Sequence, residues 1–247
     1  MEIEVNKTVL NEVSELRKLF LQENKFQFVH DKCHYYGWAD YYLFLIDGIK
    51  AGYGSVWGGS KRQDRDTIFE FYLENPYRKF SNAIFRSLQE VSKAPFVECQ
   101  TNDILLSGLV FEQAKNINAE AILFEDNFQA DLDMAGMLFK KSEKKNDNPD
   151  DSGEYVLELY GEIIASGGFM LNYNFPYADI YMEVKEKFRS KGYCSLIVQE
   201  LKKEVYNHGR VPAARCNIKN QASKSCLQKA GFKPCGFLLN GEIPVNV

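Results

Sequence analysis

The sequence lacks any long apolar run. Its longest strongly apolar stretch, Tyr41 to Ile46, is far shorter than the roughly 20 residues that a membrane-spanning helix needs. The first residues, Met1 to Asn6, also lack the basic region followed by an apolar run that marks a secretion signal. We therefore expect a cytoplasmic protein that has no membrane partner.

An excess of basic residues is also missing. The chain has 30 Lys and Arg residues against 34 Asp and Glu residues, which gives a formal net charge of −4. Binding of nucleic acid depends on clustered Lys and Arg side chains that contact phosphates. We therefore predict that nucleic acid is not a partner.

Paired cysteines are absent too. The six cysteines are scattered along the chain and form no C-x-x-C pair: Cys33, Cys99, Cys194, Cys216, Cys226 and Cys235. Without a secretion signal, we expect reduced thiols. His30, Cys33 and His34 could lie on one face of a helix, but a fourth ligand is not apparent, so we predict no metal site.

The N-terminal half has the pattern of a helix, a hairpin, a strand and a second helix. Apolar residues at helical spacing predict a helix over Val9 to Phe20. Asp47-Gly48 between two apolar runs predicts a β-hairpin over Tyr42 to Tyr53. A strand is expected at Thr67 to Leu73 and a helix at Phe80 to Val91. The aromatic-dense segment from Phe26 to Tyr42 fits either core packing or an acceptor pocket.

The polar segment Lys140 to Gly153 separates this half from a second half with the same order of elements. We expect strands at 155–160, 163–171 and 178–184, helices at 194–206 and 222–230, and a strand at 213–217 between the two helices. Gly231 should end the second helix in the left-handed conformation. The repeat predicts two units, 1–140 and 151–247, although two generic α/β segments would give a similar pattern.

One segment between a strand and a helix carries the clearest chemistry. It has the pattern Arg189-x-x-Gly192-x-Cys194. Backbone N–H groups at the start of a helix have no partner within the helix, and the helix dipole adds partial positive charge there. Gly192 allows a close approach of the backbone to a ligand or a positive φ. The segment therefore predicts an anion-binding loop.

A second motif lies downstream, from Asn220 to Phe232. In it Asn220, Lys229, Gly231 and Phe232 occupy the spacing N-x-x-A-x-x-L-Y-x-K-x-G-F, and Ser223 stands in place of Ala. The two motifs together resemble those of the GNAT superfamily of acetyl-CoA-dependent N-acyltransferases, in the same order and at a similar separation. The resemblance covers about the last third of the chain.

This resemblance implies a mixed α/β fold of two GNAT-like units, each with a central mixed β-sheet flanked by helices. It implies that acetyl-CoA is the co-substrate, bound by residues of the strand end, the loop and the second motif: Met182, Val184, Arg189, Ser190, Lys191, Gly192, Tyr193, Cys194 and Asn220. Glu183 is the candidate catalytic base, because it lies on the strand that meets the thioester in the family. It could equally be an exposed residue of a half-buried strand.

Two departures from the family pattern bear on activity. Leu227 occupies the position of the usual Tyr, which often protonates the departing CoA thiolate. Ser225, Cys226 or a bound water could serve instead, since a thiolate is a tolerable leaving group near neutral pH. In the N-terminal half, Arg78 to Ala83 has Ser81 where the loop needs Gly, so we interpret that half as a degenerate copy.

The sequence therefore favours an N-acetyltransferase that acts on an amine of a small molecule or peptide by direct attack. A non-catalytic acyl-CoA-binding or protein-interaction module is the alternative, because of Leu227 and the imperfect loops. A Fem-like aminoacyltransferase is a third hypothesis, which the acidic balance and the lack of a long helical arm disfavour. Cys194 and Cys226 invite an acyl-enzyme mechanism, but no suitable His is near them in the sequence, so we expect no thiol nucleophile.

Overall fold

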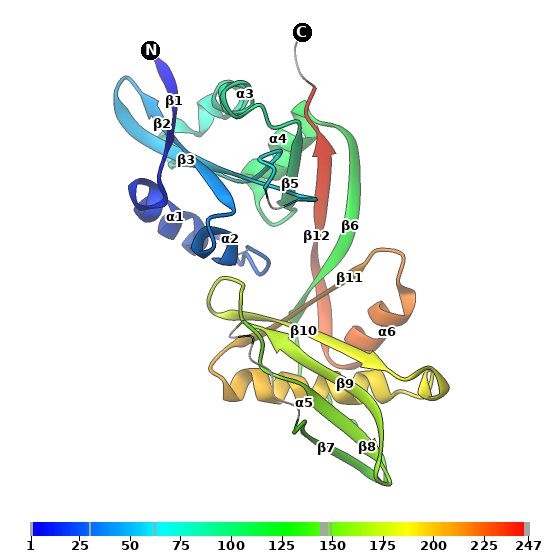
Figure 1. The fold of residues 1–247 in the computed structure, drawn as a ribbon. Coiled ribbons are helices and arrows are strands. Elements are labelled where there is room, and N and C mark those ends of the chain that lie inside the picture. The colour runs from blue at the N-terminus through cyan, green and yellow to red at the C-terminus, as the bar shows by residue number, and fades with distance from the viewer. Residues whose placement is uncertain (1, 30, 62, 144–147, 149, 245–247) are drawn as a thin grey trace. The chain divides into compact units, whose positions relative to one another are not determined.

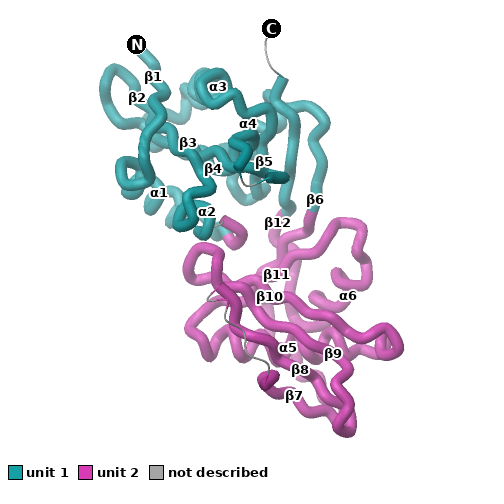
Figure 2. Tube along the Cα trace, viewed as in Figure 1, with its two compact units in different colours: residues 1–26, 31–120, 237–247 teal, residues 27–30, 121–236 magenta. Residues whose placement is uncertain are grey.

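The computed structural model describes all residues except 1, 30, 62, 144–147, 149 and 245–247 (Figure 1). The chain forms two compact units. Unit 1 comprises residues 1–26, 31–120 and 237–247, and unit 2 comprises residues 27–30 and 121–236 (Figure 2). Each unit has its own sheet, helices and hydrophobic core. Within the described residues, no helix is both long and apolar enough to cross a lipid bilayer.

Unit 1 is a mixed sheet with helices against it. Its elements are β1 (Ile3–Thr8), α1 (Leu10–Glu23), α2 (Asp31–Tyr35), β2 (Ala39–Ile46), β3 (Ile49–Trp57), β4 (Thr67–Leu73), the 3₁₀ helix η1 (Asn75–Phe80), α3 (Ser81–Ser92), β5 (Phe96–Gln100) and α4 (Ile104–Gln113). The strand order is β1-β2-β3-β4-β5, followed by the end of β12 (Phe232–Glu242). All neighbours are antiparallel except β4 and β5.

Unit 2 repeats this arrangement. Its elements are the second half of β6 (Lys115–Asp126), β7 (Met137–Lys141), β8 (Tyr155–Leu159), β9 (Glu162–Met170), β10 (Tyr177–Val184), the 3₁₀ helix η2 (Glu186–Phe188), α5 (Tyr193–Asn207), β11 (Val211–Asn217), α6 (Gln221–Lys229) and the first half of β12. The strand order is β6-β11-β10-β9-β8-β7. Of the pairs β6-β11, β11-β10, β10-β9, β9-β8 and β8-β7, as far as the structure describes them, β10-β11 is parallel and the other four are antiparallel. The expected mixed α/β fold is confirmed.

The turns form at the positions that the sequence gives them, or within one residue of those positions. Asp47 and Gly48 both have positive φ, at 49° and 78°, which is the backbone of the favoured two-residue hairpin turn between β2 and β3. Tyr160 and Gly161 repeat it between β8 and β9, at 48° and 87°. Gly231 follows α6 with φ of 93°, as expected for a residue that ends a helix in the left-handed conformation.

An arginine makes an equivalent hydrogen bond to the end of β4 in unit 1 and to the end of β10 in unit 2. Arg78 Nε donates to the carbonyl of Leu73, the last residue of β4, at 3.0 Å. Arg189 Nε donates in the same way to Val184, the last residue of β10, at 3.1 Å. Each arginine lies five residues after its acceptor, so the segments 73–78 and 184–189 align without a gap.

The expected boundary between the units differs from the observed one. The polar segment Lys140 to Gly153 was expected to link two domains, but it joins β7 to β8, which pair with each other in unit 2 from Met137–Leu159 to Lys141–Tyr155. The units divide instead at residues 120/121 and 236/237, within β6 and within β12. A polar composition predicts exposure to water, and a hairpin loop meets that condition as well as a linker does.

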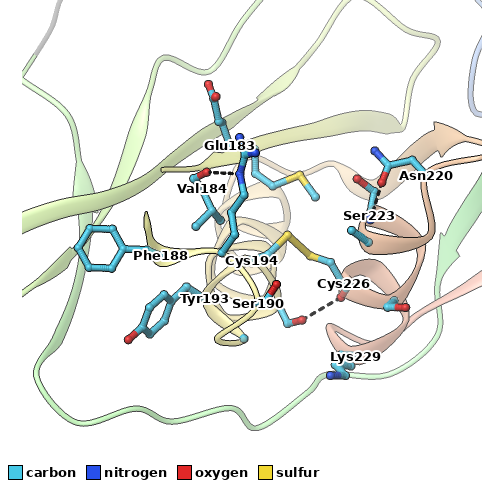
Figure 3. Close-up of a pocket in the computed structure, with 16 residues that line it drawn as sticks. Glu183, Val184, Phe188, Ser190, Tyr193, Cys194, Asn220, Ser223, Cys226 and Lys229 are labelled. Atoms are coloured by element: carbon cyan, nitrogen blue, oxygen red, sulfur yellow. Dashed lines mark hydrogen bonds between the residues drawn. A yellow bond between two sulfur atoms is a disulfide. The ribbon is translucent and has the colours of Figure 1, made fainter. Parts of the chain in front are cut away.

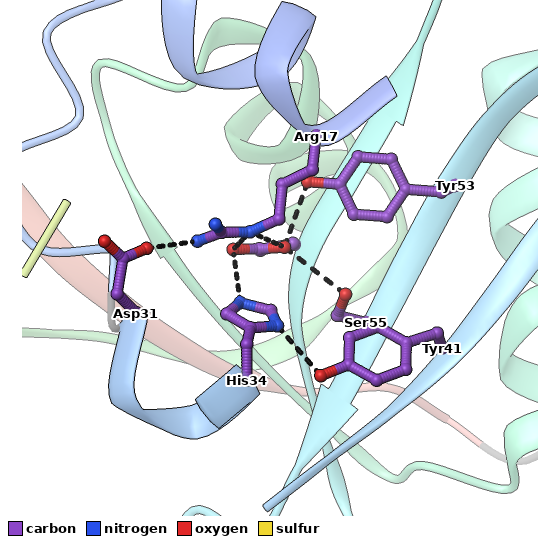
Figure 4. A network of polar contacts seen from close by, with 7 residues as sticks. Arg17, Asp31, His34, Tyr41, Tyr53 and Ser55 are labelled. Carbon is purple, nitrogen blue, oxygen red and sulfur yellow. Dashed lines mark hydrogen bonds and ion pairs between the residues drawn. The ribbon is translucent and has the colours of Figure 1, made fainter. Parts of the chain in front are cut away.

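A fully buried carboxylate lies at the centre of a polar network in unit 1 (Figure 4). Glu70 on β4 accepts hydrogen bonds from Arg17 Nε at 3.2 Å, Tyr53 Oη at 2.9 Å and Ser55 Oγ at 3.3 Å. His34 Nε2 lies 3.2 Å from the same carboxylate. Burial alone raises the pKa of Glu70, but Arg17 and His34 outweigh burial and lower it to about 2.

This network uses one of the residues considered as metal ligands. The second ring nitrogen of His34, Nδ1, lies 3.0 Å from Tyr41 Oη, so both ring nitrogens have hydrogen-bonding partners in unit 1. Cys33 is fully buried, and His30 lies outside the described residues. The aromatic segment is partly core, since Phe26 and Tyr41 are buried, but Tyr35 is 81% exposed.

Candidate active site

The central strands of unit 2 separate at one end. β10 and β11 pair over Tyr177–Asp179 and Val211–Ala213, although β10 continues to Val184 and β11 to Asn217. All residues of both strands are described. A cavity of about 580 Å³ lies at this end (Figure 3), and it is lined by the end of β10, the loop that follows, the first turn of α5 and the start of α6.

The phosphate loop, as we call residues Arg189 to Cys194, has an unusual backbone. Ser190 and Gly192 both have positive φ, at 62° and 88°. Alternation of left-handed and ordinary conformations turns successive N–H groups toward one side, which forms a concave anion site. The N–H groups of Lys191 to Cys194 have no acceptor among the described residues. The positive end of the α5 dipole coincides with them.

The cations near this loop do not all face the cavity. Arg189 and Lys229 line it, and the bond from Arg189 to Val184 fixes the loop to the end of β10. Lys191 was predicted to bind the co-substrate, but it is absent from the cavity lining, and its Nζ lies 5.6 Å from the ring centroid of Phe188. The loop therefore relies on backbone donors more than on Lys191.

Asn220 lines the cavity and begins α6. Its Oδ1 accepts a hydrogen bond from the N–H of Ser223 at 3.0 Å, so it caps the helix. Asn is one of the preferred residues at this position, because its side chain satisfies an N–H group that the helix leaves unpaired. The side-chain oxygen is thus already used, and its amide nitrogen is the group left to contact a ligand.

A disulfide joins the two helices beside the cavity. Cys194 in the first turn of α5 is bonded to Cys226 in α6, with the Cα atoms 5.9 Å apart (Figure 3). Both residues line the cavity. The expectation of six reduced thiols is therefore wrong for this pair. The two cysteines are 32 residues apart in sequence and come together through the packing of α5 on α6, so no local motif announces the bond.

Two other residues of the predicted mechanism lie in different environments. Glu183 lines the cavity, but its side chain is exposed and points away from the disulfide (Figure 3). Leu227 is only 1% exposed and belongs to the core of unit 2. It does not line the cavity, so the family's usual acid has no counterpart at this position.

The matching place in unit 1 is unsuited to phosphates. Ser81 has φ of −53° and continues the 3₁₀ helix directly into α3, so the left-handed turn of Gly192 is missing. A cavity of about 340 Å³ is present there, and its lining includes the acidic residues Glu23, Asp103 and Glu112. Carboxylates repel phosphates. The structure agrees with the interpretation of this loop as a degenerate copy.

Two family models match the chain. One, described as an acetyltransferase (GNAT) domain, matches residues 9–127, and the other, described as FR47-like protein, matches residues 175–235. The chain belongs to the GNAT superfamily. Among curated proteins, no sequence match is found.

Solved GNAT structures share the fold at low sequence identity. A GNAT-family acetyltransferase from Colwellia psychrerythraea has a TM-score of 0.74 and 16% identity, over 99% of this chain and 100% of its own. A tandem GNAT protein from the clavulanic acid biosynthesis pathway has a TM-score of 0.64 and 10% identity, over 100% of both chains. A GCN5-related N-acetyltransferase from Sphaerobacter thermophilus has a TM-score of 0.57 and 10% identity, over 99% of this chain and 97% of its own.

In this GNAT protein most of the predicted site residues lie around one cavity. The structure brings together Met182, Glu183, Val184, Arg189, Ser190, Gly192, Tyr193, Cys194 and Asn220, and leaves out Lys191. Residues that line the cavity without having been predicted to bind are Phe188, Ser195, Ala222, Ser223, Ser225, Cys226 and Lys229. Several of them belong to the second motif, which could have pointed to them.

The disulfide leads to a direct chemical expectation. Iodoacetamide added to the denatured, unreduced GNAT protein should label Cys33, Cys99, Cys216 and Cys235, and should label Cys194 and Cys226 only after reduction. Because the bond closes a loop of about 32 residues, reduction should lower the free energy of unfolding of unit 2 by about 2–4 kcal/mol. Mass spectrometry and urea unfolding followed by circular dichroism measure the two effects. Labelling of all six cysteines before reduction would contradict the bond.

Proposed function

We propose that unit 2 transfers an acetyl group from acetyl-CoA to an amine of a small molecule or peptide. The observation that carries this proposal is the phosphate loop, whose unpaired N–H groups lie at the start of α5 and beside the open end of β10. The diphosphate of acetyl-CoA would bind these donors, with Arg189 and Lys229 adding positive charge. The acyl end would then extend along β10.

The shape of the loop fits this use. A Cβ added at Gly192 would come within 2.9 Å of Met134 Cε, and φ of +88° at this position is strained for any residue with a side chain. The left-handed backbone of the loop therefore favours glycine at position 192. Membership of the GNAT superfamily supports acyl transfer in general, and acetyl-CoA as the donor belongs to our proposal.

The reaction would be a single displacement. The lone pair of the neutral amine attacks the thioester carbonyl carbon, the new C–N bond forms, and the C–S bond breaks to release the CoA thiolate. Backbone N–H groups near Met182 to Val184 would stabilise the negative charge on the carbonyl oxygen. The amine loses one proton to a base. Glu183 is the base that the resemblance predicts.

The departing thiolate needs no strong acid. Leu227 is buried and cannot donate a proton, and Cys226 has no S–H while it is bonded to Cys194. Ser225 lines the cavity and, together with bound water, would be the remaining source of a proton. Since the pKa of a thiol is about 8.5, much of the released CoA can leave as thiolate at slightly alkaline pH.

Two features favour a second function, binding of acyl-CoA without turnover. Leu227 removes the usual acid, and the disulfide removes the S–H group of Cys226. Such a protein would hold acyl-CoA on the phosphate loop and present this complex to a partner. It would release no CoA thiol in the presence of amines.

The test separates these two functions. Calorimetry should first show binding of acetyl-CoA to the full chain. Release of CoA thiol should then be measured against a panel of primary amines, including tyramine, glucosamine, lysine and a peptide with a free N-terminus. Thiol release that depends on one of these amines supports the transferase. Binding without release against the whole panel supports the binding module, and no binding of acetyl-CoA contradicts both.

A further inference from the structure

A carboxylate stands at the point where the central strands of unit 2 separate. Asp179 is the last residue of β10 that pairs with β11, opposite Ala213. Side chains alternate along a strand. The neighbours Ala178 and Ile180 are buried in the core, so Asp179 lies on the other face, the face that also carries Glu183.

One oxygen of this carboxylate has no partner. Asp179 Oδ2 lies 3.3 Å from Arg215 Nε on β11, and the side chain is only 12% exposed. Oδ1 is buried and makes no hydrogen bond within the part of the chain that the structure describes. Leaving a buried charged acceptor unpaired is costly, and native proteins seldom do so without a ligand, water or function that accounts for it. A bound water that donates to Oδ1 would satisfy it and would link it to a protonated acceptor.

Aromatic side chains hold Arg215 against this carboxylate. The guanidinium carbon of Arg215 lies 5.1 Å from the ring centroid of Phe28 and 5.3 Å from that of Tyr173. Its Nη2 donates to the hydroxyl of Tyr173, and the two rings pack edge to face at 5.4 Å. Phe28 belongs to the segment 27–30, which is part of unit 2 although it lies between α1 and α2 in sequence. Arg215 is thus oriented by its neighbours, and Oδ1 of Asp179 remains for a ligand.

We propose that Asp179 accepts the proton of the acceptor's ammonium group at Oδ1, through bound water. This inference rests on the acyl transfer proposed above and names the acceptor class as primary amines that arrive as cations. One N–H proton of the ammonium passes through bound water to Asp179, and the freed lone pair attacks the thioester carbonyl. The C–S bond then breaks, and the second proton passes from the acylated nitrogen to the CoA thiolate or to solvent. The proton leaves Asp179 for solvent after the acetylated product departs.

The distance to the thioester sets the route of the proton. If the thioester oxygen lies at Met182, three residues of extended strand separate it from Asp179, a span of about 10 Å. The proton therefore travels through a short chain of bound water, as general bases can use water to reach their substrates. Glu183 is closer along the strand, but its side chain is exposed, so it binds an ammonium in competition with bulk water.

The acidity of Asp179 agrees with this role. Burial raises the pKa of Asp179 to about 7, and the positive charge of Arg215 acts against this rise. Among the described residues, Arg215 is the charged group that acts on this carboxyl, and Tyr173, from the segment between β9 and β10, contacts Arg215. A base whose pKa lies near the working pH is ionised often enough to act and basic enough to hold the proton.

The decisive experiment compares Asp179→Asn with the wild-type full chain across pH, using an amine that the panel identifies. We expect kcat/KM at pH 7 to fall by about 10²–10⁴-fold, the effect of losing a positioned general base. The affinity for acetyl-CoA should stay within about twofold of the wild type, because the phosphate loop is untouched. The wild-type profile should rise with pH through about 7, and this rise should be absent from the variant.

Three further variants sharpen this test. Asp131→Asn makes the same chemical change at an exposed position of unit 2 and should keep wild-type kinetics. Arg215→Gln removes the charge that opposes burial, so the rise in the profile should move to higher pH. Glu183→Gln tests the rival base. A loss of activity in Glu183→Gln together with full activity in Asp179→Asn overturns the proposal and leaves acyl transfer intact.

The melting temperature of Asp179→Asn shows whether this variant folds, because the raised pKa of Asp179 affects stability as well as activity. A buried acid whose pKa is raised destabilises the fold as pH rises from its unfolded value of 3.8 to about 7. Asp179→Asn removes that penalty, so its melting temperature should equal or exceed that of the wild type at pH 8.

A wild type that binds acetyl-CoA but acetylates no amine overturns both this inference and the proposed function. An active wild type with an unchanged Asp179→Asn profile overturns this inference alone.

Discussion

Gly192→Asp should weaken the binding of acetyl-CoA by at least about 100-fold. The new carboxylate would lie among the unpaired N–H groups of the phosphate loop, where it would both fill the anion site and repel the diphosphate. Hydrogen bonds to charged groups are worth about 1.5–3 kcal/mol each, and the loss of two of them already gives this factor. Calorimetry with acetyl-CoA measures the change directly.

A neutral variant of the same shape separates charge from strain. Gly192→Asn places a side chain of nearly equal size at φ of +88°, a conformation that Asn and Asp both tolerate better than other residues. It should bind acetyl-CoA more tightly than Gly192→Asp. Ser81→Asp makes the matching change at the degenerate loop of unit 1 and should leave binding unchanged. Strong loss from Ser81→Asp with no loss from Gly192→Asp would place the site in the other unit.

Arg17→Met should destabilise unit 1 by about 3–5 kcal/mol, which is typical when one partner of a buried ion pair is removed. The Glu70 carboxylate is fully buried and the Arg17 side chain is 13% exposed, so water cannot replace the lost guanidinium. Both tryptophans of the chain, Trp38 and Trp57, lie in unit 1. Fluorescence-monitored urea unfolding therefore reports the stability of this unit.

The pH dependence gives a second readout with a definite sign. The pKa of Glu70 is lowered from 4.5 to about 2 in the fold, so its stabilising contribution is present above about pH 4.5 and is lost as pH falls toward 2. Arg17→Met should abolish much of this loss of stability at acid pH, because the variant has already lost the contact between Arg17 and Glu70.

A matched control is Lys50→Met, which removes a pair with Glu12 in which both side chains are more than half exposed. Its effect should be below about 1 kcal/mol, and an equal loss in both variants would contradict our account.

The features that the sequence predicts well are those encoded within a few residues. Asp47-Gly48 specifies its hairpin turn because both positions need positive φ. Gly192 marks the phosphate loop for the same reason, because its position also has positive φ. The binding residues around it follow from their positions next to that turn.

The elements that were not predicted depend on pairing with distant parts of the chain. In the first half of β6, from Lys115 to Glu120, polar residues alternate with Ile117 and Ala119, and the continuous apolar run of the strand lies in the part that pairs with β11. Helix α4 was also missed, because it is apolar on most sides and shows no helical periodicity. Burial in the core of unit 1, where Leu106 and Val110 lie, explains that composition only after the fold is known.

At the site, too, motifs that are continuous in sequence were predicted, and contacts between separate elements were not. The loop and the second motif are each continuous in sequence, so they were found together with most of the cavity lining. The bond between Cys194 and Cys226 and the pairing of Asp179 with Arg215 each join separate elements. The pattern of residues on a single element gives no sign of either. The structure leaves Lys191 out of the cavity lining. A loop residue can point to either side of the backbone, and composition does not choose between them.

The division of β12 between the units constrains the order in which the protein folds during synthesis. Leu238 to Glu242 pairs with β5 of unit 1, yet the ribosome makes this segment after the whole of unit 2. Until then, one side of β5 presents unpaired backbone groups of the kind that promote association between chains. Unit 1 is therefore translated first but completed last. Unit 2 can form its cavity before β12 adds the last strand to the sheet of unit 1.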